Sequence, residues 1–326
     1  MKLLRIVLPV FASILVLSAV ALYVSYQYAS SPVDPSDNAA VSVVIPRGKG
    51  AIWIGNTLKE KNLIRSTLAF RFIAWRKDLL SKMQAGSYVL NKSQSLESIA
   101  QSLTKGTNDI WVTIPEGWRN EEIAEVFGKA LGEAFDQKEF LELAKDKEGY
   151  LFPETYLIPK EATPQTVVSL LTRTFEQKFS QEMQDELKKQ QRTVKDAVIL
   201  ASLIEREARE LKEMQVVSGI LLKRIENSWP LQVDATLQYA KGFNEQQKTW
   251  WAPPLAADKT INSPYNTYKN PGLPPAPIAN PGINSLKAAV YPTESSYWYY
   301  ITDNKGEMHY AETVEQHNAN VQKYLR

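Results

Sequence analysis

Residues 192–214 read RTVKDAVILASLIEREARELKEM, an apolar stretch with charged ends. Thr193 and Asp196 match the pattern of a helix N-terminal cap. Small and aliphatic side chains then recur every three or four residues, as on the buried face of a helix; they are Val194, Ala197, Ala201, Ile204, Ala208 and Leu211. The sequence therefore predicts one amphipathic helix over 192–214 that packs through this stripe against a core.

Glu205 lies on the border of the apolar stripe. Glu207 falls on the other flank, and Glu210 and Glu213 fall on the charged outer surface. A carboxyl group on the rim of an apolar surface is partly desolvated, which disfavours its ionised form and raises its pKa towards neutrality. Glu205 is therefore a candidate general acid, and an ordinary surface glutamate is the alternative that helix geometry alone leaves open.

The composition excludes several kinds of chemistry. The chain has 326 residues, a length typical of about two domains, with 38 basic and 36 acidic residues. This balanced charge gives no reason to expect nucleic acid as a partner. There is no cysteine and there are only two histidines, which excludes disulfides and zinc–thiolate sites and argues against histidine-rich metal sites and serine–histidine triads. Any chemistry must rest on carboxylates, hydroxyls, amides or lysines.

The N-terminus has the pattern of a membrane anchor. Lys2 and Arg5 precede an uncharged run, Ile6–Ala29, that ends in a cluster of tyrosines. As a helix this run would be about 36 Å long, enough to cross a bilayer. The positive-inside rule predicts a cytoplasmic N-terminus in the inner membrane, with residues 30–326 outside the cytoplasm. A cleaved signal peptide ending near residues 19–21 is the alternative, but the run is longer than usual for one.

The rest of the chain is expected to form two α+β parts. A polar spacer precedes Val41, and a V-x-I-P-x-G pattern occurs at 43–48 and again at 112–117, each time predicting a strand, a turn and then a helix. Residues 86–106 read as a strand, a turn and a short helix, an arrangement that resembles the LysM modules that bind N-acetylglucosamine-containing glycans. A connecting subdomain that binds nothing is the alternative. The expected domains are 1–29 (cytoplasmic N-terminus and anchor), 30–40 (linker), 41–110 (LysM-like) and 111–326 (larger α+β domain).

Several elements of the larger part are predicted from its pattern. Residues 135–145 and 166–190 read as helices. A proline-rich stretch over 250–292 contains many aromatic residues and is expected to be an ordered functional loop. Residues 297–311 read as a hairpin, and a final helix is expected from Val314.

Over essentially its full length, including the N-terminal span and the LysM-like subdomain, the chain resembles the family of endolytic lytic transglycosylases called MltG or YceG-like, membrane-anchored enzymes that cut peptidoglycan glycan strands. The resemblance rests on the order and spacing of six motifs, IPEGW (114–118), GYLFPETY (149–156), ASLIEREA (201–208), LQVDATLQYA (231–240), SPYNTYKNPGLPPAPIANPGINSLKAAVYP (263–292) and HYAETVEQHN (309–318). It implies that Glu205 is the catalytic residue. It also implies that no metal or organic cofactor is needed, and that peptidoglycan synthases are partners.

The resemblance implies a mechanism with one carboxyl group. Glu205 would protonate the glycosidic oxygen and then, as a carboxylate, accept the proton of the muramic acid C6 hydroxyl, which leaves a 1,6-anhydromuramic end. A hydrolysing glycosidase normally needs a second carboxylate. Asp234 or Glu154 could take that role, so a peptidoglycan hydrolase remains an alternative. A non-catalytic glycan-binding scaffold of the wall-synthesis machinery is another.

The substrate-binding candidates fall in three motifs. Alternate residues of QVDAT would point one way from an extended segment, and PYNTY offers neutral hydrogen-bonding groups and ring faces that suit a sugar. A polar strand edge is the alternative for the first motif, and loop scaffolding, with Asn266 bonding its own backbone, for the second. The two histidines are expected to be structural. The candidates are Gln232, Asp234, Thr236, Tyr265, Asn266, Thr267, Tyr268 and Glu154.

Overall fold

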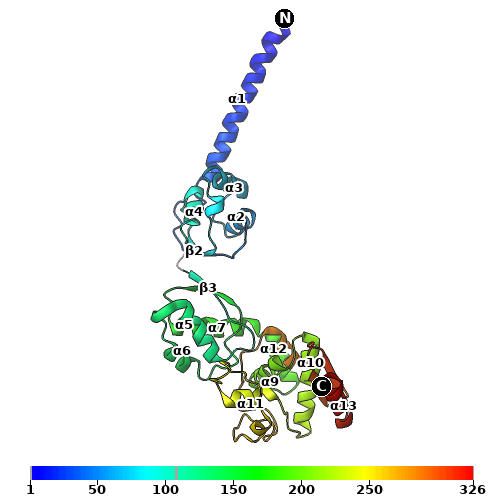
Figure 1. The fold of residues 1–326 in the computed structure, drawn as a ribbon. Coiled ribbons are helices and arrows are strands. Elements are labelled where there is room, and N and C mark those ends of the chain that lie inside the picture. Colours follow the sequence, from blue (N-terminus) through cyan, green and yellow to red (C-terminus); the bar gives the residue numbers. More distant parts are fainter. Residues whose placement is uncertain (1, 107–108, 326) are drawn as a thin grey trace. The chain divides into compact units, whose positions relative to one another are not determined.

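A computed structural model describes residues 2–106 and 109–325, without the side chains of residues 2–13 and Ala134. The chain divides into two compact units, Met1–Ile110 and Trp111–Arg326 (Figure 1). Both units combine helices with small two-stranded sheets, so the predicted α+β class is confirmed.

The predicted anchor run lies within helix α1, Lys2–Ser30. The described residues contain no helix that combines the length and the apolarity needed to cross a membrane. The side chains of the first part of the predicted span, up to residue 13, lie outside the described residues. The helix is therefore present, and the membrane span stays a prediction.

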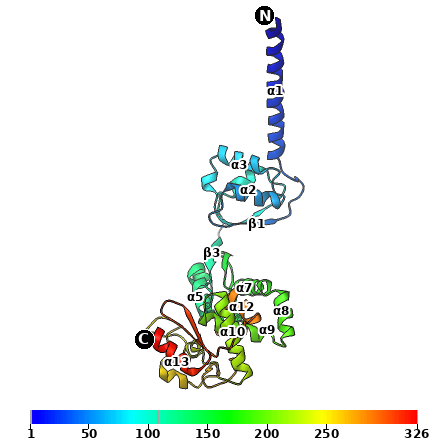
Figure 2. The same ribbon diagram turned by 90° about the vertical axis from the view of Figure 1, so that its right-hand side faces the viewer.

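The first unit has one small sheet covered by helices (Figure 2). Its two strands pair antiparallel, from Val41 opposite Leu90 to Ile45 opposite Gly86. The 30–40 segment is not a free spacer, because the Asp37 carboxylate forms an ion pair of 2.8 Å with Lys92. The elements after α1 are β1 (Val41–Ile45), α2 (Ala51–Glu60), α3 (Thr67–Arg76), η1 (Leu80–Lys82), β2 (Gly86–Leu90) and α4 (Leu96–Ser102).

The second unit is mostly helical, and its core lies around α9, with α10 and α12 beside it in both views (Figures 1 and 2). Its elements, from the strand that crosses the unit boundary onward, are β3 (Asp109–Thr113), α5 (Asn120–Leu131), η2 (Gly132–Ala134), α6 (Gln137–Ala144), β4 (Thr155–Pro159), α7 (Pro164–Lys178), α8 (Gln181–Lys189), α9 (Val194–Glu207), α10 (Leu211–Glu226), α11 (Asp234–Lys241), η3 (Ala256–Thr260), α12 (Ile283–Val290), β5 (Tyr299–Thr302), β6 (Met308–Ala311) and α13 (Val314–Tyr324). The predicted helix near 135–145, the hairpin and the final helix are confirmed.

The prediction of one helix over 192–214 is wrong at its C-terminal end. Ala208 has an extended backbone that ends α9, and α10 starts after Glu210. Glu210 and Glu213 form a capping box there, so these acids begin a new helix and do not lie on the surface of a long one. The predicted helix over 166–190 divides in the same way, because Ser180 caps the start of α8.

Helix α9 is more deeply buried than a stripe pattern indicates. Every residue from Ala197 to Ile204 is buried, and the helix contacts α8, α10, α11 and α12. A helix that is covered on several sides holds its last turn in a fixed position, which is the turn that carries Glu205.

Candidate active site

The Glu205 carboxylate is bound by the N-terminus of α12. The backbone N–H of Gly282 donates to Glu205 Oε2 at 2.8 Å, and Ser285 Oγ donates to the same oxygen at 2.5 Å. Gly282 is the N-cap of α12, so the positive end of the helix dipole also faces this carboxylate. One oxygen of the half-buried Glu205 is thus fixed by two donors.

Opposing effects set the protonation of Glu205. Burial is the largest and raises the pKa of the Glu205 carboxyl above its ordinary value, while the hydrogen bonds from Ser285 and Gly282 lower it in part. The charge of Glu116 raises the pKa further, and Arg206 lowers it. The net direction is upward, as a general acid near neutral pH requires.

Two glycines allow three segments to meet at Glu205. A Cβ atom at Gly117, whose φ is +76°, would lie 3.3 Å from Glu205 Cγ. A Cβ atom at Gly282 would collide with the Glu116 side chain. A side chain at Gly117 would therefore strain the backbone and crowd Glu205, and one at Gly282 would displace the Glu116 side chain.

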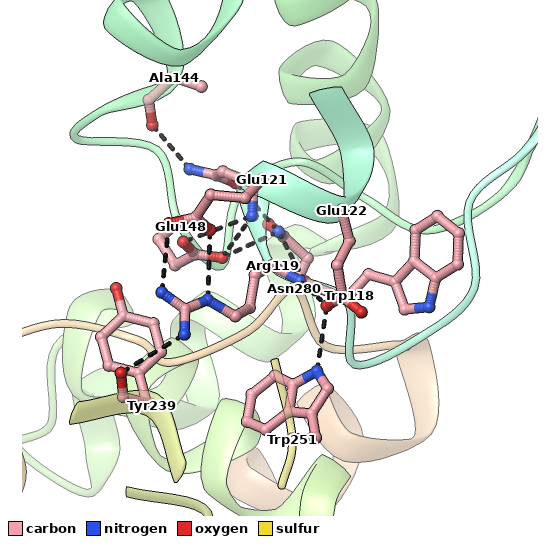
Figure 3. Close-up of polar contacts among 10 residues, drawn as sticks. Trp118, Arg119, Glu121, Glu122, Ala144, Glu148, Tyr239, Trp251 and Asn280 are labelled. Carbon is pink, nitrogen blue, oxygen red and sulfur yellow. Dashed lines mark hydrogen bonds and ion pairs between the residues drawn. The ribbon is translucent and has the colours of Figure 1, made fainter. Parts of the chain in front are cut away.

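Asn280 joins the segments around the site (Figure 3). Its backbone pairs with the 117–118 backbone through N–H···O bonds of 2.9 and 2.8 Å. Its Oδ1 accepts from the N–H groups of Gly149 and Leu151, both at 2.9 Å. Its Nδ2 donates to Trp118 O, Asn120 Oδ1 and Glu148 Oε1. The buried Asn280 side chain therefore connects three of the sequence motifs, a role that the sequence analysis did not assign.

The acid Glu148 is buried in the same network, and burial raises its pKa from 4.5 to about 8. Next to it, the Arg119 guanidinium lies 4.2 Å from the centre of the Tyr239 ring and 4.5 Å from that of Trp250. Arg119 also forms an ion pair of 3.1 Å with Glu121 (Figure 3). These contacts hold the start of α5 against α11 and against the loop that contains Trp250.

Glu207 is a second acid at the site. It lies between two cavities of about 330 and 570 Å³, the smaller of which Glu205 also lines. Burial raises the pKa of Glu207 to about 7, and the charge of Asp234 contributes to this rise. The helical pattern predicts Glu207 on a flank of the helix, without a role. No signal in the sequence marks it as part of the site, because the end of α9 at Glu207 is not predicted.

Three of the predicted substrate-binding residues line the larger cavity, namely Gln232, Asp234 and Tyr268. The Tyr268 hydroxyl donates to Asp234 Oδ1 at 2.6 Å. Arg224, Tyr299 and Tyr300 line the same cavity. The structure thus brings together part of QVDAT and part of PYNTY beside Glu207.

The other candidates lie elsewhere. The expected extended segment is wrong, because α11 begins at Asp234 and turns Thr236 inward, where its hydroxyl lies 2.9 Å from that of Thr267. Asn266 is buried and bonds its own loop, as the scaffolding alternative proposed. Tyr265 packs on Tyr239. Glu154 is exposed, forms an ion pair with Lys178 and lines neither cavity.

Both histidines contact other side chains of the second unit. His309 contacts Asp303 at 3.0 Å and stacks on Tyr324. His317 stacks on Tyr299 at the edge of the larger cavity.

Replacing Ser285 by alanine is expected to raise the pKa of Glu205 further. The serine hydroxyl stabilises the ionised carboxylate and so lowers the pKa of Glu205 in the wild type. If Glu205 acts as an acid, the alkaline limb of kcat/KM should move to higher pH in the variant. Ser169→Ala, on the exposed face of α7, is the control. If Ser285→Ala left the alkaline limb of kcat/KM unchanged, that limb would not report the titration of Glu205.

Comparison with known proteins covers nearly the whole chain. The model of the YceG-like family matches residues 43–323. An endolytic murein transglycosylase of Bacillus subtilis strain 168 is 32% identical, over 90% of this chain and 87% of that protein. A protein of the same description from Streptococcus pneumoniae D39 is 29% identical over 93% of this chain, which spans only 62% of that longer relative.

A solved structure supports the same relationship. The crystal structure of a yceG-like protein from Listeria monocytogenes matches with a TM-score of 0.54 and 27% identity, over 86% of this chain and 99% of that one. Sequence and fold therefore agree over both units, and the chain belongs to the YceG-like family.

Proposed function

We propose that this protein is a lytic transglycosylase that cuts peptidoglycan glycan strands between N-acetylmuramic acid and N-acetylglucosamine and leaves 1,6-anhydromuramic ends. Its relatives named endolytic murein transglycosylase support the reaction class. The observation that carries the proposal is Glu205, a carboxyl with a raised pKa that borders a cavity and is fixed by two donors.

Glu205 acts first as an acid. Its protonated form gives the proton to the glycosidic oxygen as the bond from that oxygen to C1 of muramic acid breaks. The carboxylate that remains is stabilised by the N–H of Gly282 and the hydroxyl of Ser285. It then takes the proton of the C6 hydroxyl while that oxygen bonds to C1, which restores the acid and closes the anhydro ring.

The groups that line the larger cavity, which Glu207 joins to the cavity of Glu205, suit a polyhydroxylated substrate. Asp234 and Tyr268 offer an acceptor and a ring face, and Gln232 offers an amide. The Glu207 carboxyl lines both cavities, and its ionised form, favoured above its raised pKa of about 7, would stabilise positive charge that develops on the sugar ring. Thr236, Asn266 and Thr267 support these residues from the interior.

A hydrolase is the competing function, with Asp234 activating water. We expect purified glycan strands to give anhydro ends by mass spectrometry, both with the wild type and with Asp234→Asn. The variant should be slower, because Tyr268 loses its charged partner. Glu154→Gln, which removes only the exposed pair with Lys178, should match the wild type. Reducing ends that disappear in Asp234→Asn would establish the hydrolase, and intact strands from a protein that still binds them would support the scaffold.

The proposal includes a location and partners. The uncharged run Ile6–Ala29 anchors the chain in the inner membrane, with residues 30–326 on the outer side, where peptidoglycan is found. The strand β2 and the short helix α4 have the order on which the LysM-like interpretation of residues 86–106 rests, and this unit is proposed to contact glycan. Peptidoglycan synthases are proposed as partners by resemblance to the family.

A further inference from the structure

Helices α2 and α3 expose an apolar face. Five large side chains on these helices and on the turn after α3 are between 42% and 74% exposed; they are Ile52, Leu68, Phe72, Trp75 and Leu80. They surround a shallow groove of about 840 Å³. This surface, here called the α2–α3 face, is of the kind that marks an interaction site on a protein.

The α2–α3 face continues onto helix α1. The rings of Tyr26 and Phe72 meet edge to face, with their centres 5.8 Å apart. The described part of α1 exposes apolar side chains on all sides, and such a helix needs an apolar environment; among them are Ile14, Leu15, Val16, Leu17, Val20, Leu22 and Val24. One apolar surface therefore runs from α1 onto α3 within the same unit.

Basic and aromatic groups border this surface. Arg71 lines the groove, and Lys49 lies over the Trp53 ring at 5.7 Å. Arg65 lies over the Tyr28 ring at 4.5 Å and donates to the Tyr28 hydroxyl. Among the described residues, no carboxylate lines the groove. Aromatic rings with lysine and arginine beside an apolar surface are typical of groups at the headgroup level of a bilayer with anionic lipids.

We propose that the α2–α3 face lies in the bilayer interface, with its apolar side chains among the upper acyl chains and its basic side chains at anionic headgroups. The inference rests on the proposed membrane anchor and goes beyond it. With α1 in the bilayer, this second contact would hold the first unit in one orientation to the membrane surface. The occupant of the groove is lipid.

The absence of cysteine allows a direct test. Leu68→Cys and Trp75→Cys would each carry one fluorescent label in the full chain. The chain would be reconstituted in vesicles of phosphatidylethanolamine and phosphatidylglycerol that contain a lipid spin-labelled near its headgroup. Both labels should lose emission relative to vesicles without spin label. Val89→Cys is the matched control, because Val89 on β2 is 72% exposed, close to the 74% of Leu68, and lies outside the α2–α3 face.

Labels at 68 and 75 that emit as strongly as the label at 89 would overturn the proposal, and so would a chain that does not float with the vesicles. Strong quenching at all three positions would contradict a specific face. Because the readout involves no glycan, cleavage by the same samples is measured separately. A quenched but inactive protein would refute only the proposed reaction, and an active but unquenched protein would refute only the docking.

Discussion

Replacing Glu205 by glutamine is expected to lower the rate of glycan cleavage by about 10²- to 10⁴-fold, the range typical of a lost general acid. The amide has nearly the shape of the carboxyl group, and its oxygen can still accept from Gly282 and Ser285. It carries no acidic proton for the glycosidic oxygen. The free energy of unfolding should stay the same or increase, because the variant no longer buries an ionisable group.

Mass spectrometry of strands digested by the two proteins would test this expectation, with denaturation curves to confirm that both are folded. Glu176→Gln is the control, because Glu176 is an exposed glutamate on α7 in the same unit. The control should cut at the wild-type rate. If Glu205→Gln produced anhydro ends as fast as the wild type, another group would carry out the proton transfer. Glu207 would be the first residue to examine.

Helical periodicity was sufficient to place Glu205 on the border of the buried face of α9, whereas its catalytic role is implied only by the resemblance to the family. Helical periodicity predicts which residues of α9 are buried, and a residue on the border of that set is predicted to be partly desolvated. The end of α9 could not be found in this way, because Ala208 and Leu211 continue the same periodicity. The capping box of Glu210 and Glu213 marks the break, but its two acids fit an exposed helical surface equally well.

The candidates in QVDAT and PYNTY show that residue spacing does not predict which polar side chains are buried. Thr236 and Thr267 are buried because their hydroxyls bond each other across 31 residues of sequence. Each residue alone looks like a polar surface group, and only the fold shows that its partner is present. Asn280 is a stronger example, since its side chain is fully buried and its partners lie more than a hundred residues away in sequence. Nothing within the proline-rich stretch predicts those partners.

Asn280→Ala is expected to lower the free energy of unfolding by about 3–5 kcal/mol, the range for breaking a buried hydrogen-bond network. The change leaves the N–H groups of Gly149 and Leu151 buried without their acceptor, and Glu148 loses one donor. Urea denaturation followed by tryptophan fluorescence measures the loss. Asn318→Ala, at an exposed position on α13, should change stability by no more than about 0.5 kcal/mol. A loss that small in Asn280→Ala would mean that the three motifs are held together by other contacts.

Asn280→Asp separates the loss of hydrogen bonds from the effect of charge. The new carboxyl group still accepts from Gly149 and Leu151, but it lies beside Glu148 Oε1, where the wild-type amide donates at 3.2 Å. Burial already raises the pKa of Glu148 from 4.5 to about 8, so the folded chain binds more protons than the unfolded chain, and stability falls as pH rises through this range. A second buried carboxyl adds to that difference because two adjacent negative charges disfavour each other. The loss of unfolding free energy in Asn280→Asp relative to wild type should therefore grow between pH 5 and pH 8. The loss in Asn280→Ala should change much less over this range. If the losses of unfolding free energy in the two variants had the same pH dependence, the charge state of Glu148 would have no part in holding the loops around Glu205.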